Sequence, residues 1–172
     1  MLISVEELKL HPVSISKTYP AGALDYKTAD FRQLGVLKVQ GVAELVGMEI
    51  RFRGRLNTQV EASCDRCLGT VEIPVESNFD LIYRPMKTIA RQEEVEVPAA
   101  ELEVGFYTGS GIELAEVVTE QVNLAIPMKI VCRVDCQGLC PTCGINRNLA
   151  TCHCTAPSPE SHESPFAALL GD

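Results

Sequence analysis

The chain has 172 residues and a formal net charge of −8, with 46% apolar and 22% charged residues. This composition is typical of a globular domain with a hydrophobic core rather than of a disordered chain. The negative charge excludes a protein whose whole body coats nucleic acid, because neutralising phosphates takes clustered Lys and Arg, and it disfavours docking on an anionic membrane. The apolar runs fall short of the ~20 residues of a membrane-spanning helix.

The start of the chain bears on its compartment. Residues 1–10 carry two glutamates and lack a basic region followed by an apolar stretch, so they do not resemble a signal peptide. We therefore expect a cytoplasmic protein, in a compartment that keeps thiols reduced. Eight cysteines in such a chain favour metal ligation over disulfide bonds.

A short helix and then a series of strands are predicted along the first half. Ser4 and Glu7 have the spacing of a capping box, which predicts a helix that ends before Pro12. From Val36, apolar and polar residues alternate in three long runs, with a turn at 46–48, as in half-buried antiparallel strands. The apolar positions are Leu37, Val39, Gly41, Ala43 and Leu45; Ile50, Phe52, Leu56 and Val60; and Val71, Ile73, Val75, Phe79, Leu81 and Tyr83.

The third run contains Pro74, which predicts that this strand is an edge or is bulged there. A loop over 85–92 and weaker strands over 94–97 and 102–106 follow. From Ile112 to Ile126 the apolar spacing becomes helical, and Pro127 ends the pattern. We expect the apolar stripe of this helix to cover the sheet; it comprises Leu114, Val117, Val118, Val122 and Ala125.

The first cysteine pair, Cys64 and Cys67, falls between the second and third strands and so belongs at a hairpin tip. A C-x-x-C turn places two thiolates on one side, with backbone N–H groups directed at the sulfurs, which is half of a tetrahedral zinc site. A thioredoxin-like redox pair also has this spacing, but it would precede a helix in a βαβ unit, whereas strands flank this pair.

The densest cysteine group lies near the C-terminus. Residues 140–144 read Cys-Pro-Thr-Cys-Gly, a zinc knuckle in which Pro fixes the turn and Gly144 tolerates a tight or left-handed position. Cys152 and Cys154 alternate in extended backbone and can face one metal, with His153 pointing away. A closed structural site would comprise Cys140, Cys143, Cys152 and Cys154; the alternative is that His153 replaces one cysteine ligand.

Cys132 and Cys136 remain to be paired with Cys64 and Cys67. We predict that these four form a second site, which would fasten the C-terminal segment to the hairpin tip; the alternative is a single zinc ion, with Cys132 as a buried apolar thiol. Closed sites of four cysteines leave no coordination position for water. The predicted cofactor is therefore one or two structural Zn²⁺ ions, which stabilise the fold without implying hydrolysis.

These cysteine motifs resemble those of a known family. Residues 64–68, Cys-Asp-Arg-Cys-Leu, are similar to its C-x-R-C-L segment, and residues 132–154, CRVDCQGLCPTCGINRNLATCHC, are similar to its C-terminal pattern. Residues 165–169 are similar to its usual ending. On these motifs the chain resembles the YceD family, the large ribosomal RNA subunit accumulation proteins. The resemblance implies a bacterial or plastid factor needed for 23S ribosomal RNA accumulation, which binds ribosomal RNA or the assembling pre-50S particle.

Candidate RNA-binding residues are arginines. Arg51, Arg53 and Arg55 form a basic stripe on one strand face that would suit phosphates; the alternative is an ordinary solvated sheet face. Arg66 and Arg147 lie in or near the cysteine motifs and would extend this patch. Phe52 faces the other side of the strand, so the stripe is not the aromatic platform of single-strand binders.

Taken together, the patterns predict an α+β fold: a mostly antiparallel β-sheet or partly open barrel with one covering helix and a C-terminal zinc-knuckle segment. We expect a body over 1–131, a cysteine-rich segment over 132–154, and a flexible linker with an apolar tail over 155–172. The tail, Phe166 to Leu170, is a candidate docking motif for a partner protein or for the chain's own sheet.

The sequence shows no Ser–His–Asp or Cys–His order and no paired acid and base. We therefore predict a non-enzymatic, zinc-binding ribosome-biogenesis factor. The alternatives are an rRNA-processing enzyme with an unrecognised active site and a thiol- or zinc-based redox switch.

Overall fold

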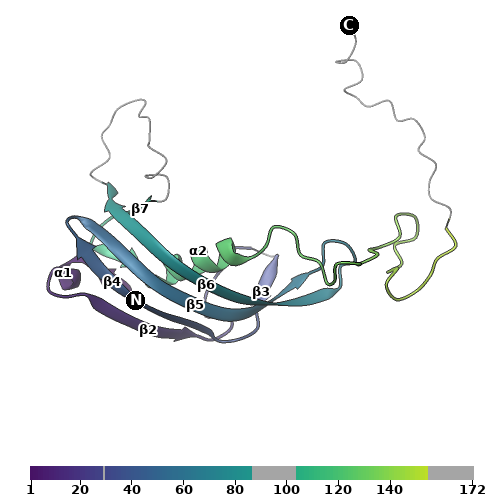
Figure 1. The fold of residues 1–172 in the computed structure, drawn as a ribbon, viewed down its shortest axis with the longest axis horizontal. Helices are drawn as coiled ribbons and strands as arrows, with labels where there is room; N and C mark the ends of the chain where they lie inside the picture. Colours follow the sequence, from purple (N-terminus) through teal and green to yellow (C-terminus); the bar gives the residue numbers. More distant parts are fainter. Residues whose placement is uncertain (29, 87–103, 155–172) are drawn as a thin grey trace, which may run out of the picture.

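The three alternating runs form the three longest strands in a computed structural model that describes residues 1–28, 30–86 and 104–154. Figure 1 shows them as long curved ribbons that lie side by side. The elements in chain order are β1 (Leu2–Ser4), α1 (Val5–Leu8), β2 (Val13–Tyr19), β3 (Phe31–Gln33), β4 (Leu37–Val46), β5 (Glu49–Ser63), β6 (Thr70–Pro85), β7 (Val104–Tyr107), β8 (Gly111–Glu113) and α2 (Leu114–Ala125).

The main sheet has the order β2-β4-β5-β6-β7, and β3 pairs with β5 beyond the end of β4. Every pairing is antiparallel except β6 with β7, which is parallel. The sheet is open and does not close into a barrel. The predicted α+β fold with a mostly antiparallel sheet is confirmed.

The hydrophobic core lies between one face of this sheet and α2, which Figure 1 shows behind β6. Alternate residues of β4 and β5 point inward, and Leu37, Phe52 and Val60 are fully buried. On α2, Leu114, Val118 and Val122 are buried against them, so the predicted stripe covers the sheet. The prediction missed Gln121, which is also buried on this helix.

Several predicted boundaries need correction. The helix begins at Leu114 rather than Ile112, because 111–113 pair with β1 instead. Strands β1, β2 and β3 were not predicted from the sequence. Pro74 of β6 pairs with Gln59 of β5 on one side. On the other side of β6, the described strand β7 pairs only from Ile82 on. Pro74 therefore lies where β6 is an edge strand, as predicted. The predicted strand over 94–97 lies outside the described residues, whereas 104–106 belong to β7.

The short helix at the N-terminus is confirmed, and its Ser4 side chain accepts a hydrogen bond from the Glu6 N–H, as expected of an N-cap. Within the described residues, no helix is long and apolar enough to cross a membrane.

Two glycines make room for a pair of core aromatic rings. Gly41 and Gly54 face each other across β4 and β5, and the Phe52 and Phe79 rings meet edge to face with centroids 5.0 Å apart. A Cβ at Gly54 would lie 2.8 Å from Phe79 Cζ and 2.6 Å from the Gln40 carbonyl oxygen. A larger residue here would force the strands or rings apart.

We expect Gly54→Ala to destabilise the protein by about 1 to 3 kcal/mol, because the added methyl group overpacks the core. Thermal unfolding followed by circular dichroism measures this change. Gly35→Ala is the control, since its Cβ would lie 3.5 Å from Gln59 Cβ, an ordinary contact. Equal melting temperatures for the two variants would contradict the packing argument.

Candidate metal centres

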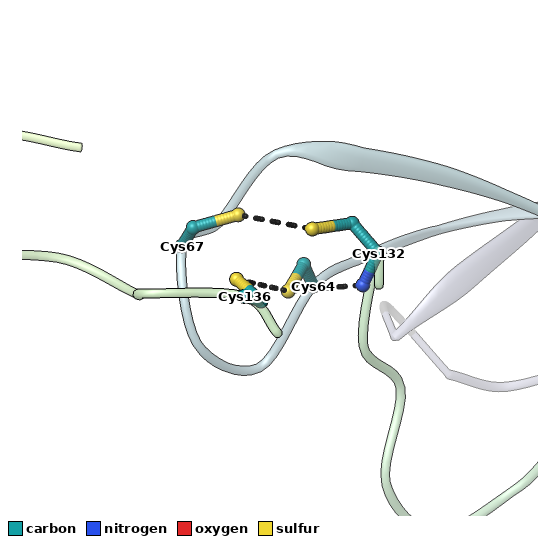
Figure 2. A group of neighbouring side chains, drawn as sticks. All are labelled: Cys64, Cys67, Cys132 and Cys136. Atoms are coloured by element: carbon teal, nitrogen blue, oxygen red, sulfur yellow. Dashed lines mark hydrogen bonds between the residues drawn. The ribbon is translucent and has the colours of Figure 1, made fainter. Parts of the chain in front are cut away.

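The first cysteine cluster, cluster I, joins the tip of the β5–β6 hairpin to the segment that follows α2. It comprises Cys64, Cys67, Cys132 and Cys136. Figure 2 shows the two hairpin sulfurs facing the two sulfurs of the later segment. The hairpin tip is a tight loop, closed by hydrogen bonds from the Cys64 N–H to the Gly69 carbonyl at 2.8 Å and from the Leu68 N–H to the Cys64 carbonyl at 2.9 Å. Leu68 has a left-handed φ of 57° there.

Polar contacts around cluster I hold the two chain segments together. Asp65 bonds Ile130 twice: its N–H donates to the Ile130 carbonyl at 2.8 Å, and its carboxylate accepts from the Ile130 N–H at 2.6 Å. The Arg66 guanidinium donates to the Cys136 carbonyl at 3.0 Å, and the Arg66 carbonyl accepts from Leu139. The segment therefore docks on the hairpin tip through backbone as well as through cysteine.

The sulfur geometry of cluster I fits a tetrahedral metal. Cys64 Sγ lies 3.9 Å from Cys136 Sγ, and Cys67 Sγ lies 3.7 Å from Cys132 Sγ. A tetrahedron of sulfurs about 2.3 Å from a central zinc has edges of about 3.8 Å, whereas a disulfide bond measures about 2.05 Å. All four ligand atoms lie within 4.8 Å of one another.

The surroundings of cluster I shift the pKa values of its thiols in opposite directions. Burial raises the pKa of the Cys64 thiol, but the N–H groups of Cys132, Arg66 and Cys67 outweigh this effect and lower that pKa to about 6. The Cys132 pKa instead rises to about 12, chiefly through its hydrogen bond with Cys136 and through burial. Four thiolates this close repel one another, so their joint ionisation requires a cation at the centre.

The second cluster, cluster II, lies within the C-terminal segment alone. It comprises Cys140, Cys143, Cys152 and Cys154, whose sulfurs also lie within 4.8 Å of one another. Gly144 closes the knuckle, with its N–H on the Cys140 carbonyl at 2.9 Å and a left-handed φ of 72°, as the sequence predicts. The backbone N–H groups of Cys143 and Thr142 lower the Cys140 pKa to about 6.

The two clusters differ in burial. In cluster I only Cys132 is exposed, whereas in cluster II only Cys140 is buried. His153 is exposed and belongs to neither cluster of the described chain. The structure thus brings together the same two sets of four cysteines that the spacing predicts; that they bind metal stays a prediction.

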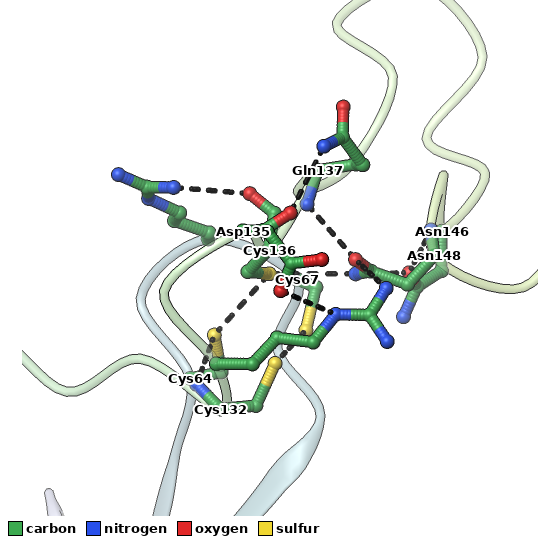
Figure 3. A network of polar contacts seen from close by, with 10 residues as sticks. Cys64, Cys67, Cys132, Asp135, Cys136, Gln137, Asn146 and Asn148 are labelled. Carbon is green, nitrogen blue, oxygen red and sulfur yellow. Dashed lines mark hydrogen bonds and ion pairs between the residues drawn. The ribbon is translucent and has the colours of Figure 1, made fainter.

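Asn148, which was not among the residues predicted from the sequence, bonds the segment that carries Cys136 to the segment that follows the knuckle. Figure 3 shows it between the 132–137 segment and Asn146. Its Nδ2 donates to Cys136 Sγ at 3.4 Å and to Asn146 Oδ1 at 2.9 Å, while its Oδ1 accepts from the Gln137 N–H at 2.9 Å. The sequence feature that could have indicated this role is the Asn-Arg-Asn run at 146–148, which follows the knuckle.

The arginine stripe faces solvent, as predicted, but its side chains have partners on neighbouring strands. Arg51 binds Asp80 through two nitrogens, the Nε at 2.8 Å. Arg53 binds Glu44 at 2.7 Å. Arg55 donates to Gln40 at 3.0 Å. The charges of the first two arginines are therefore compensated within the sheet face.

The other two candidate arginines lie at the cysteine-rich end. Arg66 supports cluster I through Cys136, whereas the Arg147 side chain lines a hollow of about 390 Å³ beside Cys140 and Cys152. The five candidate RNA-binding residues thus form two separate groups, one on the sheet face and one at the clusters.

The protein belongs to the α+β class. One face of its sheet is covered by α2, and four cysteines bring the tip of the longest hairpin together with the C-terminal segment. The chain belongs to the YceD family, described as large ribosomal RNA subunit accumulation protein YceD, whose family profile matches residues 52–171. The family resemblance noted in the cysteine motifs is confirmed.

Among its relatives, an uncharacterised protein of Mycobacterium tuberculosis strain H37Rv is 31% identical over 109 residues, covering 63% of this chain and 48% of that protein. An uncharacterised Mycobacterium leprae protein is 25% identical, covering 79% and 56%. The chloroplastic YCED homolog 1 of Arabidopsis thaliana, named as a large ribosomal RNA subunit accumulation protein, is 22% identical, covering 70% and 44%. The chain thus spans about half the length of these relatives. No solved structure matches it.

Cluster I joins the hairpin tip to the C-terminal segment, whereas cluster II lies within that segment alone, so loss of each cluster should affect stability differently. We expect Cys64→Ser to lose one of two bound metal ions and to destabilise the fold by on the order of 4 kcal/mol, because the hairpin tip loses its fastening. Cys143→Ser should lose the other ion with little effect on melting of the sheet. Elemental analysis with thermal unfolding checks both. Equal destabilisation by the two variants would contradict the assignment of the fastening to cluster I.

Asn148→Ala should weaken metal retention at cluster I, because the variant removes the amide that bonds Cys136 Sγ and orients the 132–137 segment. Groups that orient metal ligands typically contribute about 10- to 100-fold in affinity. Competition with a chromophoric chelator measures the change. The control is Asn78→Ala on the exposed face of β6, which should leave the affinity unaltered.

Proposed function

We propose that this protein is a zinc-binding, non-catalytic factor that supports accumulation of 23S ribosomal RNA by acting on the assembling large ribosomal subunit in the cytoplasm. Family membership supports the biological role, and the two clusters support the cofactor. Thiolates are soft ligands, and sets of four in tetrahedral spacing select zinc or iron–sulfur centres over magnesium or calcium. Sulfur separations of 3.7 and 3.9 Å favour a single central ion such as Zn²⁺.

The observation that carries the proposal is the position of cluster I at the tip of the longest hairpin. A metal held there would fix the shape of the adjoining surface rather than open a reaction site, because four cysteines complete the coordination of zinc. That surface displays large apolar side chains: Leu68 is 67% exposed, Val134 94% and Leu149 85%. Exposed apolar side chains in one region are typical of binding surfaces.

The role is tested by depletion and complementation. Cells depleted of the protein should show a lower ratio of 23S to 16S ribosomal RNA, and the wild-type gene should restore it. The double variant Cys64→Ser, Cys67→Ser should not, whereas Gly35→Ala, which leaves the clusters intact, should. An unchanged RNA ratio after full depletion would exclude the proposed function.

The metal assignment has its own measurement. Protein purified under reducing conditions should contain two zinc ions per chain, one for each cluster. A content of only one zinc ion in fully loaded protein would rule out the two-site arrangement. A visible absorption band of an iron–sulfur cluster would show that the metal is iron rather than zinc.

The structure argues against contact of the arginine stripe with RNA phosphates, the contact that the sequence had suggested. Because Arg51, Arg53 and Arg55 already have partners on neighbouring strands, we expect their joint replacement by Ser to leave RNA affinity and its salt dependence unchanged. Filter binding of 23S ribosomal RNA over a range of salt concentrations checks this. If the stripe does neutralise phosphates, the slope of log affinity against log salt falls by about 0.7 to 0.9 for each lost contact.

A further inference from the structure

The solvent-facing side of α2 carries acidic side chains without partners. Glu116 and Glu120 are exposed and four residues apart, so they are neighbours on one helix face. Neither carboxylate has an ion pair or hydrogen bond to any residue in the described part of the chain. Like charges at this spacing destabilise a helix, so the fold itself gains nothing from them.

Two hollows flank this acidic ridge. On one side, the 23–27 segment and α2 line a hollow of about 600 Å³, to which the segment contributes Leu24 and Tyr26 together with the charged Asp25 and Lys27. On the other side, Tyr83 of β6 and Gly105 of β7 line a hollow of about 420 Å³. Glu120 and Leu124 border both hollows, and Leu124 is 71% exposed. The ridge thus combines negative charge with apolar surface on both flanks.

A polar side chain lines the second hollow without bonding a residue of the described chain. Gln121 lines this hollow and is only 9% exposed, yet no hydrogen bond is formed by its side chain in the described structure. Among the described residues, Tyr19 Oη is the one buried side-chain nitrogen or oxygen without a partner, so the Gln121 amide is open to this hollow and can bond a ligand there. Beside it, burial together with the charge of Glu120 raises the pKa of Tyr83 to about 12, which keeps the phenol neutral.

The chemistry of this face selects its partner. Carboxylates repel RNA phosphates, and the chain as a whole is acidic, with a net charge of −8. The two carboxylates lie on an open ridge with apolar flanks, which suits an elongated ligand rather than an enclosed metal ion. A lysine or arginine can lay its apolar stem along Leu124 while its charged end reaches a carboxylate.

We propose that the α2 face, defined by Glu116, Glu120, Gln121 and Leu124, binds an amphipathic, lysine- or arginine-rich segment of another protein. Basic side chains of the segment meet Glu116 and Glu120, one donates to the Gln121 amide oxygen, and apolar side chains contact Leu24 and Leu124. The inference rests on the proposed function, because proteins that coat ribosomal RNA carry such basic clusters and an assembling subunit presents them.

Binding of a labelled probe tests the face directly. The probe is a fluorescein-labelled amphipathic helix of lysine and leucine with the 12-residue length of α2, followed by fluorescence anisotropy. The double variant Glu116→Gln, Glu120→Gln should bind about tenfold more weakly at low salt, with the difference shrinking as salt is added. The control Glu72→Gln, Glu76→Gln makes the same charge change on exposed positions of β6 and should bind like wild type. Equal affinities for wild type and the α2 variant would overturn the proposal.

Gln121→Leu separates a binding role from a structural one. Replacing an amide that bonds no described residue by an apolar side chain of similar volume should not lower the melting temperature. The same change should weaken probe binding several-fold, because the acceptor is lost. A lower melting temperature with unchanged probe affinity would show that Gln121 serves the fold, and would overturn its place in the site.

RNA is the competing partner, and protein-free 23S ribosomal RNA is the probe for it. If Glu116→Gln, Glu120→Gln lowers affinity for this RNA, the face binds RNA and the proposal is overturned; unchanged or higher RNA affinity supports it. The complementation assay keeps the two proposals apart. Normal 23S ribosomal RNA in depleted cells would exclude the proposed function while the probe result still stands, whereas full complementation by the α2 variant would overturn this inference alone.

Discussion

The structure depends on four cysteines whose sulfur atoms are brought within 4.8 Å of one another at the tip of one long hairpin. Strands β5 and β6 extend past the main core, and at their tip the buried Cys64, Cys67 and Cys136 form a small cluster of their own, packed on Val71 and Val131. Backbone N–H groups directed at the sulfurs favour ionisation of individual thiols, but only a cation lets all four ionise together. The metal proposed for cluster I would therefore link folding of this end of the molecule to metal binding.

The same fastening positions α2. Its N-terminus is held where the Leu114 N–H bonds the Met1 carbonyl and β8 pairs with β1. Its C-terminal continuation reaches Ile130, which is bonded twice to Asp65 beside cluster I. The helix is thus fixed at one end by a short ladder and at the other by the hairpin tip. A change at cluster I would reach the helix through this connection, without touching the helix itself.

Patterns within single segments predicted much of this arrangement. Period-two alternation gave β4, β5 and β6, helical spacing gave α2, and cysteine spacing gave the two clusters. The features that were not predicted depend on contacts between segments far apart in the sequence. The three-residue strands β1 and β8 are too short to show a period and exist because they pair with each other. Arg51 and Arg53 were placed on the correct face, but their partners Asp80 and Glu44 follow from strand register, which alternation does not specify. β2 was a different failure, since Val13 and Ile15 already alternate with serines.

The net charge of the two cysteine clusters affects which ligand the surface of the protein can attract. Four thiolates around one divalent cation carry a net charge of about −2, so metal loading of both clusters makes an already acidic chain more negative. Arg66, which bonds the Cys136 carbonyl, compensates part of this charge and is less available to phosphates as a result. The sheet face compensates its own arginines in the same way. Within the described residues Arg51, Arg53 and Arg66 have partners in the fold, whereas Glu116 and Glu120 of α2 have none. Negative charge on the α2 face is therefore left to attract a ligand. For the function proposed above, such a surface would be complementary to proteins that bind ribosomal RNA rather than to the RNA itself.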